Sequence, residues 1–216
     1  MALSSRSKRK KAPINSSARE RILEVATSLF EKSPFDQISA TQIAMEAGVA
    51  HGLPFHYFGS KAKLYEEVSR LAAARIDLIH LSATRNRSSV GGLRAFLLAH
   101  METVWDRRAD YVFHSRGGGT PAIQKIWEDS RLNGIHLVLG LFGVVDPSNE
   151  LVVATRAWLG FFDELVLAWV QGNVKSKRAV IESTLRQFPP ALMSASILGA
   201  KDVPRLPPVL LESKLR

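Results

Sequence analysis

The feature that most constrains this chain is the segment of residues 37–65, QISATQIAMEAGVAHGLPFHYFGSKAKLY. It reads as two short helices joined by a turn at Gly48, and glycine adopts the positive φ that such a turn needs at no steric cost. The second helix, about residues 51–58, ends in aromatic side chains. This layout predicts a helix-turn-helix, in which the second helix projects outward and can enter a DNA groove.

Start and stop signals place helices along the whole chain. Ser16 or Ser17 can cap an amphipathic helix that ends before Ser33-Pro34, and Ser39 with Gln42 forms a capping-box pattern for the next one. Residues 86–92 are expected to be a loop, residues 109–115 a short helix at best, and Pro189-Pro190 a helix end. Further helices are expected at about residues 60–83, 93–107, 121–142, 151–171 and 176–187.

No run of strand-like alternation and no internal repeat is visible. The sequence therefore predicts an all-α fold of about nine helices, with a three-helix head and a larger helical body. We expect four parts: a disordered basic arm (1–16), the DNA-binding head (17–59), a ligand-binding and dimerisation body (60–190), and a C-terminal tail (191–216).

The composition narrows the function classes. The formal net charge of +9 and a pI near 10.1 fit a polyanionic partner. The absence of cysteine excludes disulfide scaffolds and is compatible with a reducing cytosol, so a cytoplasmic protein is expected. The apolar stretch from Leu151 to Val170 carries Arg156, Asp163 and Glu164, and charges are costly at membrane depth, so no membrane partner is expected.

The residues in and around the turn resemble the DNA-binding domain of TetR-type (tetracycline-repressor-like) transcriptional regulators over about residues 17–68. The resemblance implies a homodimer in which each head reads half of a near-palindromic DNA operator, and a body whose small-molecule effector releases the DNA. It is carried by a dozen positions: Ile43, Ala44, Ala47, Gly48, Val49, Gly52, His56, Tyr57, Phe58, Ser60, Lys61 and Leu64.

The same resemblance supplies candidate DNA contacts. Phosphate contacts are implied for Thr41, Tyr57 and Lys61, and backbone N–H groups at the start of a helix can hold a phosphate oxygen. The remaining candidates are Ser39, Ala40 and Gln42 at the first helix, and Ala50, His51, Gly52, Leu53, Phe55 and His56 at the groove.

Two positions depart from the family pattern. His51 stands where a Lys or Arg is frequent, which weakens the attraction to phosphate at that point. Pro54 stands where an aliphatic residue is usual, and proline lacks a backbone N–H. We expect a second helix that starts late, so that Pro54 lies in its first turn, where the missing donor costs little.

Residues before the head form a basic arm without an acidic side chain. Its five cations, Arg6, Lys8, Arg9, Lys10 and Lys11, could follow a minor groove beside the head. The alternative is a solvated tail with no role in binding.

The body offers candidate interface and effector residues. The expected helix 151–171 is apolar on nearly every side, which requires burial on more than one face. With the helix after it, it is expected to form a two-fold four-helix interface through Trp158, Phe162, Leu165, Trp169, Val180, Ile181, Leu185 and Phe188. A pocket for a mainly apolar effector is expected among Trp105, Tyr111, Phe113, His114, Arg116, Trp127, Leu137 and Phe142.

No catalytic or metal-binding pattern accompanies these residues. The six histidines form no His-x-x-x-His pair, and no Gly-x-Ser-x-Gly elbow or phosphate loop occurs, so neither an enzyme nor a cofactor is expected. We conclude that the chain is a ligand-responsive regulator, most simply a repressor. The alternatives are a non-specific architectural DNA binder, and a helical carrier or enzyme with a vestigial helix-turn-helix.

Overall fold

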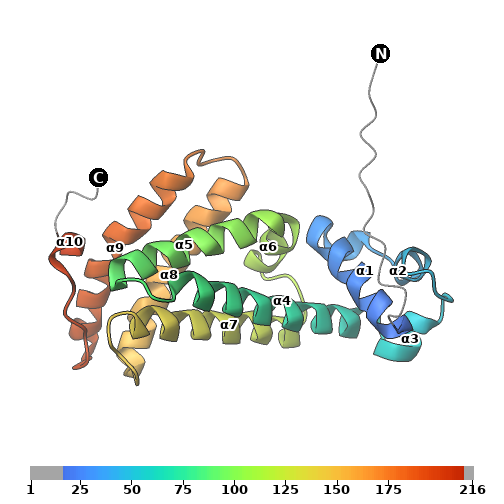
Figure 1. The fold of residues 1–216 in the computed structure, drawn as a ribbon, viewed down its shortest axis with the longest axis horizontal. Helices are drawn as coiled ribbons and strands as arrows, with labels where there is room; N and C mark the ends of the chain where they lie inside the picture. The colour runs from blue at the N-terminus through green and yellow to red at the C-terminus, as the bar shows by residue number, and fades with distance from the viewer. Residues whose placement is uncertain (1–16, 212–216) are drawn as a thin grey trace, which may run out of the picture. The chain divides into compact units, whose positions relative to one another are not determined.

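The structure is a computed structural model and describes residues 17–211. This part of the chain contains ten α-helices, one 3₁₀ helix and no strand, as the periodicity predicts (Figure 1). The contacts divide it into two compact units, one ending at Val68 and the other beginning at Ser69. Their elements are α1 (Ala18–Lys32), η1 (Phe35–Gln37), α2 (Ala40–Glu46), α3 (Leu53–Phe58), α4 (Lys61–Thr84), α5 (Ser89–Asp106), α6 (Arg108–Ser115), α7 (Pro121–Gly140), α8 (Asn149–Val170), α9 (Lys177–Leu198) and α10 (Pro208–Leu211).

The first unit is the expected three-helix head, with the beginning of α4 added. Ser17 caps α1, and Glu20 returns the bond to complete the capping box, so two otherwise unpaired backbone groups are satisfied together. The core of this unit is apolar side chains at helical spacing on α1, α2 and α4. They include Ile22, Ala26, Phe30, Ile43, Ala44, Leu64 and Val68, all almost fully buried.

The second unit has its core among α5, α7, α8 and α9. The largest buried side chain, that of Trp158 in α8, donates its indole N–H to the Thr184 carbonyl of α9 at 2.8 Å. A buried Trp needs such a partner, because an unpaired polar atom in an apolar core costs about 1–3 kcal/mol. This bond fixes the position of α9 along α8.

Helix α5 begins earlier than the sequence predicts. Residues 86–92 were expected to be a loop because of their polarity and glycines, but Ser88 caps a helix that starts at Ser89. Gly92 lies inside that helix and is buried, and a Cβ built on it would lie 2.8 Å from Leu141 Cδ2. The glycine therefore permits close packing rather than a turn.

Helix α9 continues past the point where the sequence predicts its end. Pro189 and Pro190 lie inside a helix that runs to Leu198 and ends at Gly199, whose φ is +107°. The expectation of a tail over 191–216 was therefore wrong for residues 191–198. Burial of Phe188, Leu192 and Ala195 offsets the two missing backbone donors.

The described helices include none that is long and apolar enough to span a membrane.

Candidate functional site

The turn between α2 and α3 has the predicted geometry. Gly48 has φ +63°, and the Val49 N–H donates to the Ala44 carbonyl at 3.0 Å, which satisfies an end carbonyl of α2. Ser39 caps the start of α2 through the Gln42 N–H at 3.0 Å, while the Gln42 side-chain amide donates to Glu46. The Ser39 half of the predicted capping box is therefore present.

Helix α3 starts late, as Pro54 led us to expect. Gly52 is its N-cap and Pro54 lies in its first turn, where a backbone N–H has no helical partner in any case. The first main-chain bond inside the helix runs from the His56 N–H to the Gly52 carbonyl at 3.0 Å. The proline ring is buried, so it also anchors α3 to the rest of the unit.

The outer surface of α3 consists of neutral, mainly aromatic side chains. Phe55 is 52% exposed and Tyr57 is 41% exposed, although both are large and apolar. Tyr57 packs its ring against His56 at 5.3 Å, which restricts both side chains. Of the other candidates for DNA contact, Ser39, Thr41, Ala50, His51 and Gly52 are exposed, and Ala40, Gln42 and Leu53 are partly so.

The candidate Lys61 is used inside the first unit. Its ammonium group donates to the carbonyls of Phe35 and Ile38, both at 3.0 Å, and lies 3.9 Å from the Phe35 ring centroid. These carbonyls belong to the 3₁₀ turn η1 and the residue that ends it, a turn that no pattern in the sequence predicts. Lys61 therefore closes the loop before α2 as well as carrying charge.

The other cations of this unit also make internal contacts. Arg19 pairs with Glu67 at 2.7 Å, Arg21 donates to the Ala47 carbonyl, and Lys63 pairs with Glu66 at 2.9 Å. Lys32 contacts the Ser28 hydroxyl. Residues 17–68 hold these five Lys and Arg against seven Asp and Glu, a net charge of −2. The arm residues Arg6, Lys8, Arg9, Lys10 and Lys11 lie outside the described residues.

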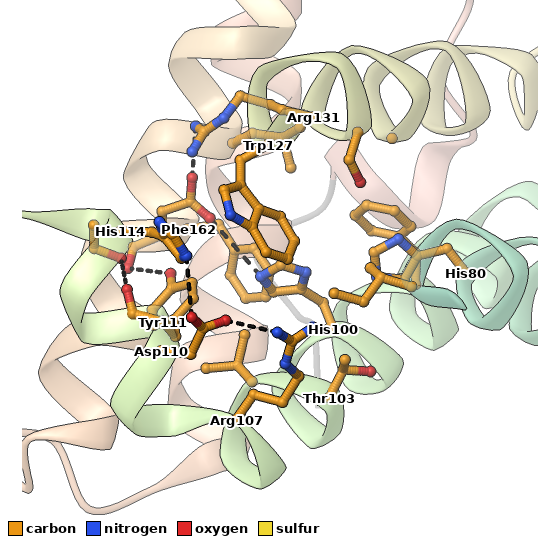
Figure 2. Close-up of a pocket in the computed structure, with 18 residues that line it drawn as sticks. His80, His100, Thr103, Arg107, Asp110, Tyr111, His114, Trp127, Arg131 and Phe162 are labelled. Atoms are coloured by element: carbon orange, nitrogen blue, oxygen red, sulfur yellow. Dashed lines mark hydrogen bonds and ion pairs between the residues drawn. The ribbon is translucent and has the colours of Figure 1, made fainter. Parts of the chain in front are cut away.

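A cavity of about 180 Å³ lies in the second unit, lined by α4, α5, α6, α7 and α8 (Figure 2). Aromatic and aliphatic faces of Phe96, Trp127, Leu159 and Phe162 form part of its wall. The remaining wall includes the aliphatic Ile76 and Val104 together with three histidines and two Arg–Asp pairs.

The sequence identified three members of this cavity wall: Tyr111, His114 and Trp127. The other five candidates do not line it. Trp105 is 46% exposed and stacks on Trp169 at 5.0 Å. Arg116 is exposed at the end of α6, and Phe142 packs on Phe188 in the core.

Phe113 and Leu137 are the remaining two of these five. Leu137 packs against the core cluster of the second unit. Phe113 lies against Gly118, where an added Cβ would meet its ring at 2.6 Å. Helical periodicity marks all five residues as apolar or amphipathic but does not say which face of each helix meets the cavity.

The charged groups of the cavity were missed. Arg107 pairs with Asp110 at 2.7 Å, and Asp110 also contacts His114 Nε2 at 3.1 Å. Arg131 of α7 pairs with Asp163 of α8 at 2.6 Å. The spacing of Arg107 and Asp110 along one helical turn was a visible signal, whereas Arg131 and Asp163 meet only through tertiary packing.

Two buried histidines stack beside these pairs. The rings of His80 and His100 lie 5.4 Å apart, and His80 also stacks on Phe96 at 4.4 Å. Burial lowers the pKa of His80 to about 4, against the opposing effect of Asp77. Burial lowers the pKa of His100 to about 3, and the neighbouring His80, when protonated, and Arg131 act in the same direction. Both rings are therefore neutral at pH 7.

The pKa of Asp163 is shifted in the opposite direction to those of the two histidines. Burial raises the pKa of its carboxyl to about 6, although Arg131 opposes that rise. Tyr111 donates its hydroxyl to the Asp163 backbone carbonyl at 3.2 Å, and burial raises the pKa of that phenol.

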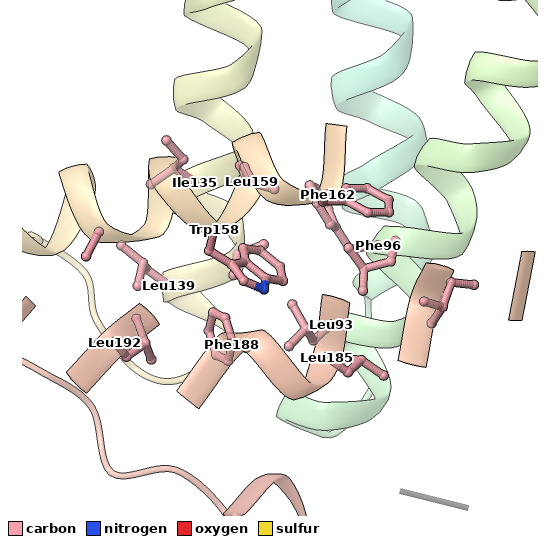
Figure 3. Packing of buried hydrophobic residues seen from close by; sticks show 14 of the residues in the cluster. Leu93, Phe96, Ile135, Leu139, Trp158, Leu159, Phe162, Leu185, Phe188 and Leu192 are labelled. Atoms are coloured by element: carbon pink, nitrogen blue, oxygen red, sulfur yellow. The ribbon is translucent and has the colours of Figure 1, made fainter. Parts of the chain in front are cut away.

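The predicted interface residues belong mainly to the core of the single chain (Figure 3). Leu165 and Trp169 are only partly buried, but the other six are 0–3% exposed: Trp158, Phe162, Val180, Ile181, Leu185 and Phe188. These six lie inside the core of the single chain and offer almost no exposed surface to a partner. The all-round apolar character of residues 151–171 reflects packing on α5, α7 and α9 within one chain.

Comparison with known proteins places these features in context. Residues 22–68 match the family model of bacterial regulatory proteins of the tetR family. The chain is 25% identical over 175 residues to the HTH-type transcriptional repressor BepR of Brucella suis biovar 1 (strain 1330), covering 72% of this chain and 81% of that protein.

Two solved structures share the fold. A tetR-family transcriptional regulator from Streptomyces coelicolor superposes with a TM-score of 0.74 at 20% identity, over 84% of this chain and 82% of that one. The regulator FadR from Bacillus subtilis, solved in complex with stearoyl-CoA, gives 0.59 at 20% identity, over 77% of this chain and 97% of that one.

Proposed function

We propose that this chain, which belongs to the tetR family of bacterial regulatory proteins, is a dimeric repressor that leaves a near-palindromic operator when a small molecule enters the cavity of its second unit. Family membership makes it a DNA-binding transcriptional regulator. The observation that carries the proposal is the outward surface of α3, with Phe55 half exposed beyond a glycine turn.

Base recognition is proposed for the neutral side chains at α3. No Lys or Arg lies between residues 47 and 60, so the bidentate contact of Arg with guanine is not available there. Leu53 and Phe55 can contact thymine methyl groups, and His51 and His56 can hydrogen-bond to base edges. Ala50 and Gly52 are small enough to let the backbone approach the DNA closely. Phosphate contacts are proposed for Tyr57 and Thr41, with Ser39, Ala40 and Gln42 beside them.

The basic arm is proposed to supply most of the attraction to the phosphates. The described head has a net charge of −2 and its cations make internal contacts, whereas the arm carries five cations and no acid. Deleting residues 1–12 should lower the magnitude of the slope of log K against log salt by up to about 4.5, at roughly 0.9 per lost phosphate contact. An unchanged slope would show that the arm does not touch DNA.

The dimer interface is proposed on the outward faces of α8 and α9. Val153 and Phe161 of α8 are 55% and 37% exposed, and Met193 and Ile197 of α9 are 67% and 87% exposed. Apolar side chains exposed to this extent on two neighbouring helices suit a self-complementary two-fold interface. Phe161→Glu with Met193→Glu should give a monomer in sedimentation, while Val145→Glu, 96% exposed on a loop, should not.

The effector is proposed to bind in the cavity that contains Tyr111, His114 and Trp127. If effector and operator favour different arrangements of the dimer, each must weaken the other by the same factor. This reciprocity distinguishes a regulator from the two alternatives. An architectural binder needs no effector, and a carrier or enzyme needs no operator preference.

The first test is fluorescence anisotropy of the purified protein on the DNA upstream of its own gene, against scrambled duplex, at near-physiological salt. A preference of about 10³-fold or more, with two protomers per site, supports a specific dimeric regulator. Equal and weak binding to both duplexes would favour the architectural alternative. Pro54→Leu, which lets α3 start earlier, should change operator affinity or sequence preference, and an unchanged profile would exclude a role of Pro54 in recognition.

A further inference from the structure

The cavity of the second unit contains buried polar atoms that no group in residues 17–211 satisfies. They are Trp127 Nε1, Arg107 Nε, His80 Nε2 and His100 Nε2, none of which has a hydrogen-bond partner in the described chain. His100 Nε2 lies 3.9 Å from Asp163 Oδ1, which is beyond hydrogen-bond distance. Figure 2 shows their side chains pointing into the same space. Folded proteins pair nearly all buried polar groups with protein or ordered water, so four such atoms at one site favour a cavity whose contents, water or a bound molecule, make polar contacts with its wall.

Two of these atoms define the kind of contact. The indole N–H of Trp127 and the Nε–H of Arg107 can only donate a hydrogen bond. The Arg107 guanidinium lies 5.5 Å from the Trp127 ring centroid and is held by Asp110 at 2.7 Å, so the two donors are neighbours in fixed positions. The bound molecule must therefore bring acceptor atoms to this side of the cavity.

The charges of the wall are already balanced. Arg107 is paired with Asp110 and Arg131 with Asp163, and the buried His80 and His100 rings are neutral at pH 7. An ionic ligand would find no uncompensated counter-charge among these groups and would lose its hydration on entry. A neutral ligand does not meet this cost.

The volume of the cavity and the aromatic rings in its wall limit the size and shape of the ligand. A cavity of about 150 Å³ holds one benzene molecule, so about 180 Å³ holds a single ring with a small substituent. The rings of Phe96, Phe162 and Trp127 offer faces and edges for offset or edge-to-face contact with such a ring. A long acyl chain, as in the stearoyl-CoA bound by the Bacillus subtilis FadR, does not fit this volume.

We propose that the effector is a small, neutral, one-ring aromatic compound whose carbonyl or similar oxygen accepts hydrogen bonds from Trp127 Nε1 and Arg107 Nε. This rests on the proposed function only in taking the cavity as the effector site. Trp127 is then the residue that distinguishes ligands with an acceptor from hydrocarbons of the same shape.

The test is isothermal calorimetry of the full chain, without DNA, against three compounds of similar size: acetophenone, ethylbenzene and benzoate. Acetophenone should bind most tightly. Ethylbenzene should bind about 5–10-fold more weakly, because it leaves the donors unpaired. Benzoate should bind at least 10-fold more weakly. Tightest binding of benzoate, equal binding of acetophenone and ethylbenzene, or no binding of acetophenone would overturn the proposal.

A matched pair of variants assigns the effect to the indole N–H. Trp127→Phe keeps an aromatic ring and removes the donor. It should therefore weaken the binding of acetophenone about 5–10-fold and leave the binding of ethylbenzene unchanged. Trp105→Phe, outside the cavity wall, should change neither. If Trp127→Phe lowers the affinity for both compounds equally, then the indole contributes through its ring and not through its N–H donor, and the proposal is overturned.

Addition of acetophenone to the protein–operator complex separates this inference from the proposed function. Binding to the free chain with no release of DNA would support the ligand class and contradict the effector role. Loss of operator preference in the anisotropy experiment, with the calorimetric ranking intact, would contradict the regulator and leave the ligand class standing.

Discussion

At the scale of single residues, two positions in the head have roles that are set by backbone geometry. Gly48 and Gly52 lie four residues apart in the same loop, and a Cβ added to either would meet nothing within 4 Å. They differ in conformation alone, because Gly48 has φ +63° and Gly52 has φ −80°. Any difference between alanine substitutions at the two positions therefore reports backbone strain.

Gly48→Ala should lower the free energy of unfolding by about 1–2 kcal/mol, since a side chain at positive φ clashes with its own backbone. Gly48→Asn should lower the free energy of unfolding by less, because Asn tolerates a positive φ. Urea unfolding followed by circular dichroism measures both, with Gly52→Ala as the strain-free control. Equal effects of alanine at the two positions would show that Gly48 is not held at positive φ.

Lys61 has a role set by its side chain, because its ammonium group donates to two carbonyls before α2. Lys61→Gln should lower the free energy of unfolding by about 1–3 kcal/mol, the usual range for hydrogen bonds to a charged group. Lys32→Gln on the exposed end of α1 should have little effect. If Lys61→Gln weakens DNA binding without changing stability, then its role is phosphate contact alone.

At the scale of elements, α9 shows how packing outweighs local preference. Its two prolines each lack the N–H that would bond the carbonyl four residues back, those of Leu185 and Arg186. The helix persists because its inward face, from Val180 to Ala195, is buried along α8 and α5. Pro189 is part of that buried face, whereas Pro190 is exposed.

Pro190→Ala should therefore raise the free energy of unfolding, by up to the roughly 3 kcal/mol that separates the two residues in helix interiors. Pro189→Ala should raise the free energy of unfolding by less, because it also removes a buried ring. Thermal unfolding of both variants at one protein concentration compares them. A lower melting temperature for Pro190→Ala would mean that the exposed proline makes contacts elsewhere, as at the proposed dimer interface.

At the scale of the whole molecule, the buried titratable groups of the second unit make the free energy of unfolding depend on pH. His80 and His100 have pKa values below their usual 6.5, so their protonation favours the unfolded chain and stability is lost as pH falls below 6.5. Asp163 acts oppositely, because its raised pKa means that stability is gained as pH falls through 6. Two histidines against one carboxyl give a net loss on acidification.

Between pH 6 and pH 5 these three groups should together lower the free energy of unfolding by about 1.4 kcal/mol. His80 faces Asp77 and His100, and His80→Gln removes its titration. The variant should flatten the curve of stability against pH by about one proton over this range, while His136→Gln on the surface serves as the control. Parallel curves for His80→Gln and the unaltered chain would show that His80 is not buried in its neutral form.

Features that depend on neighbours along the chain can be predicted from the sequence. The Ser17 cap, the positive φ at Gly48 and the late start of α3 at Pro54 follow from local sterics and hydrogen bonding, and the helical periods follow from apolar spacing. These features were sufficient to identify the helix-turn-helix and the helical fold class.

Which faces of those helices meet becomes clear only from the folded structure. It placed Trp158 and Phe188 in the core of one chain instead of at an interface, and it brought His80, His100, Arg131 and Asp163 to one cavity from four different helices. The physical reason is that an apolar or charged residue has the same local signature whether it faces a core, a cavity or a partner. Burial and pairing, which distinguish these cases, depend on contacts between residues far apart in the sequence.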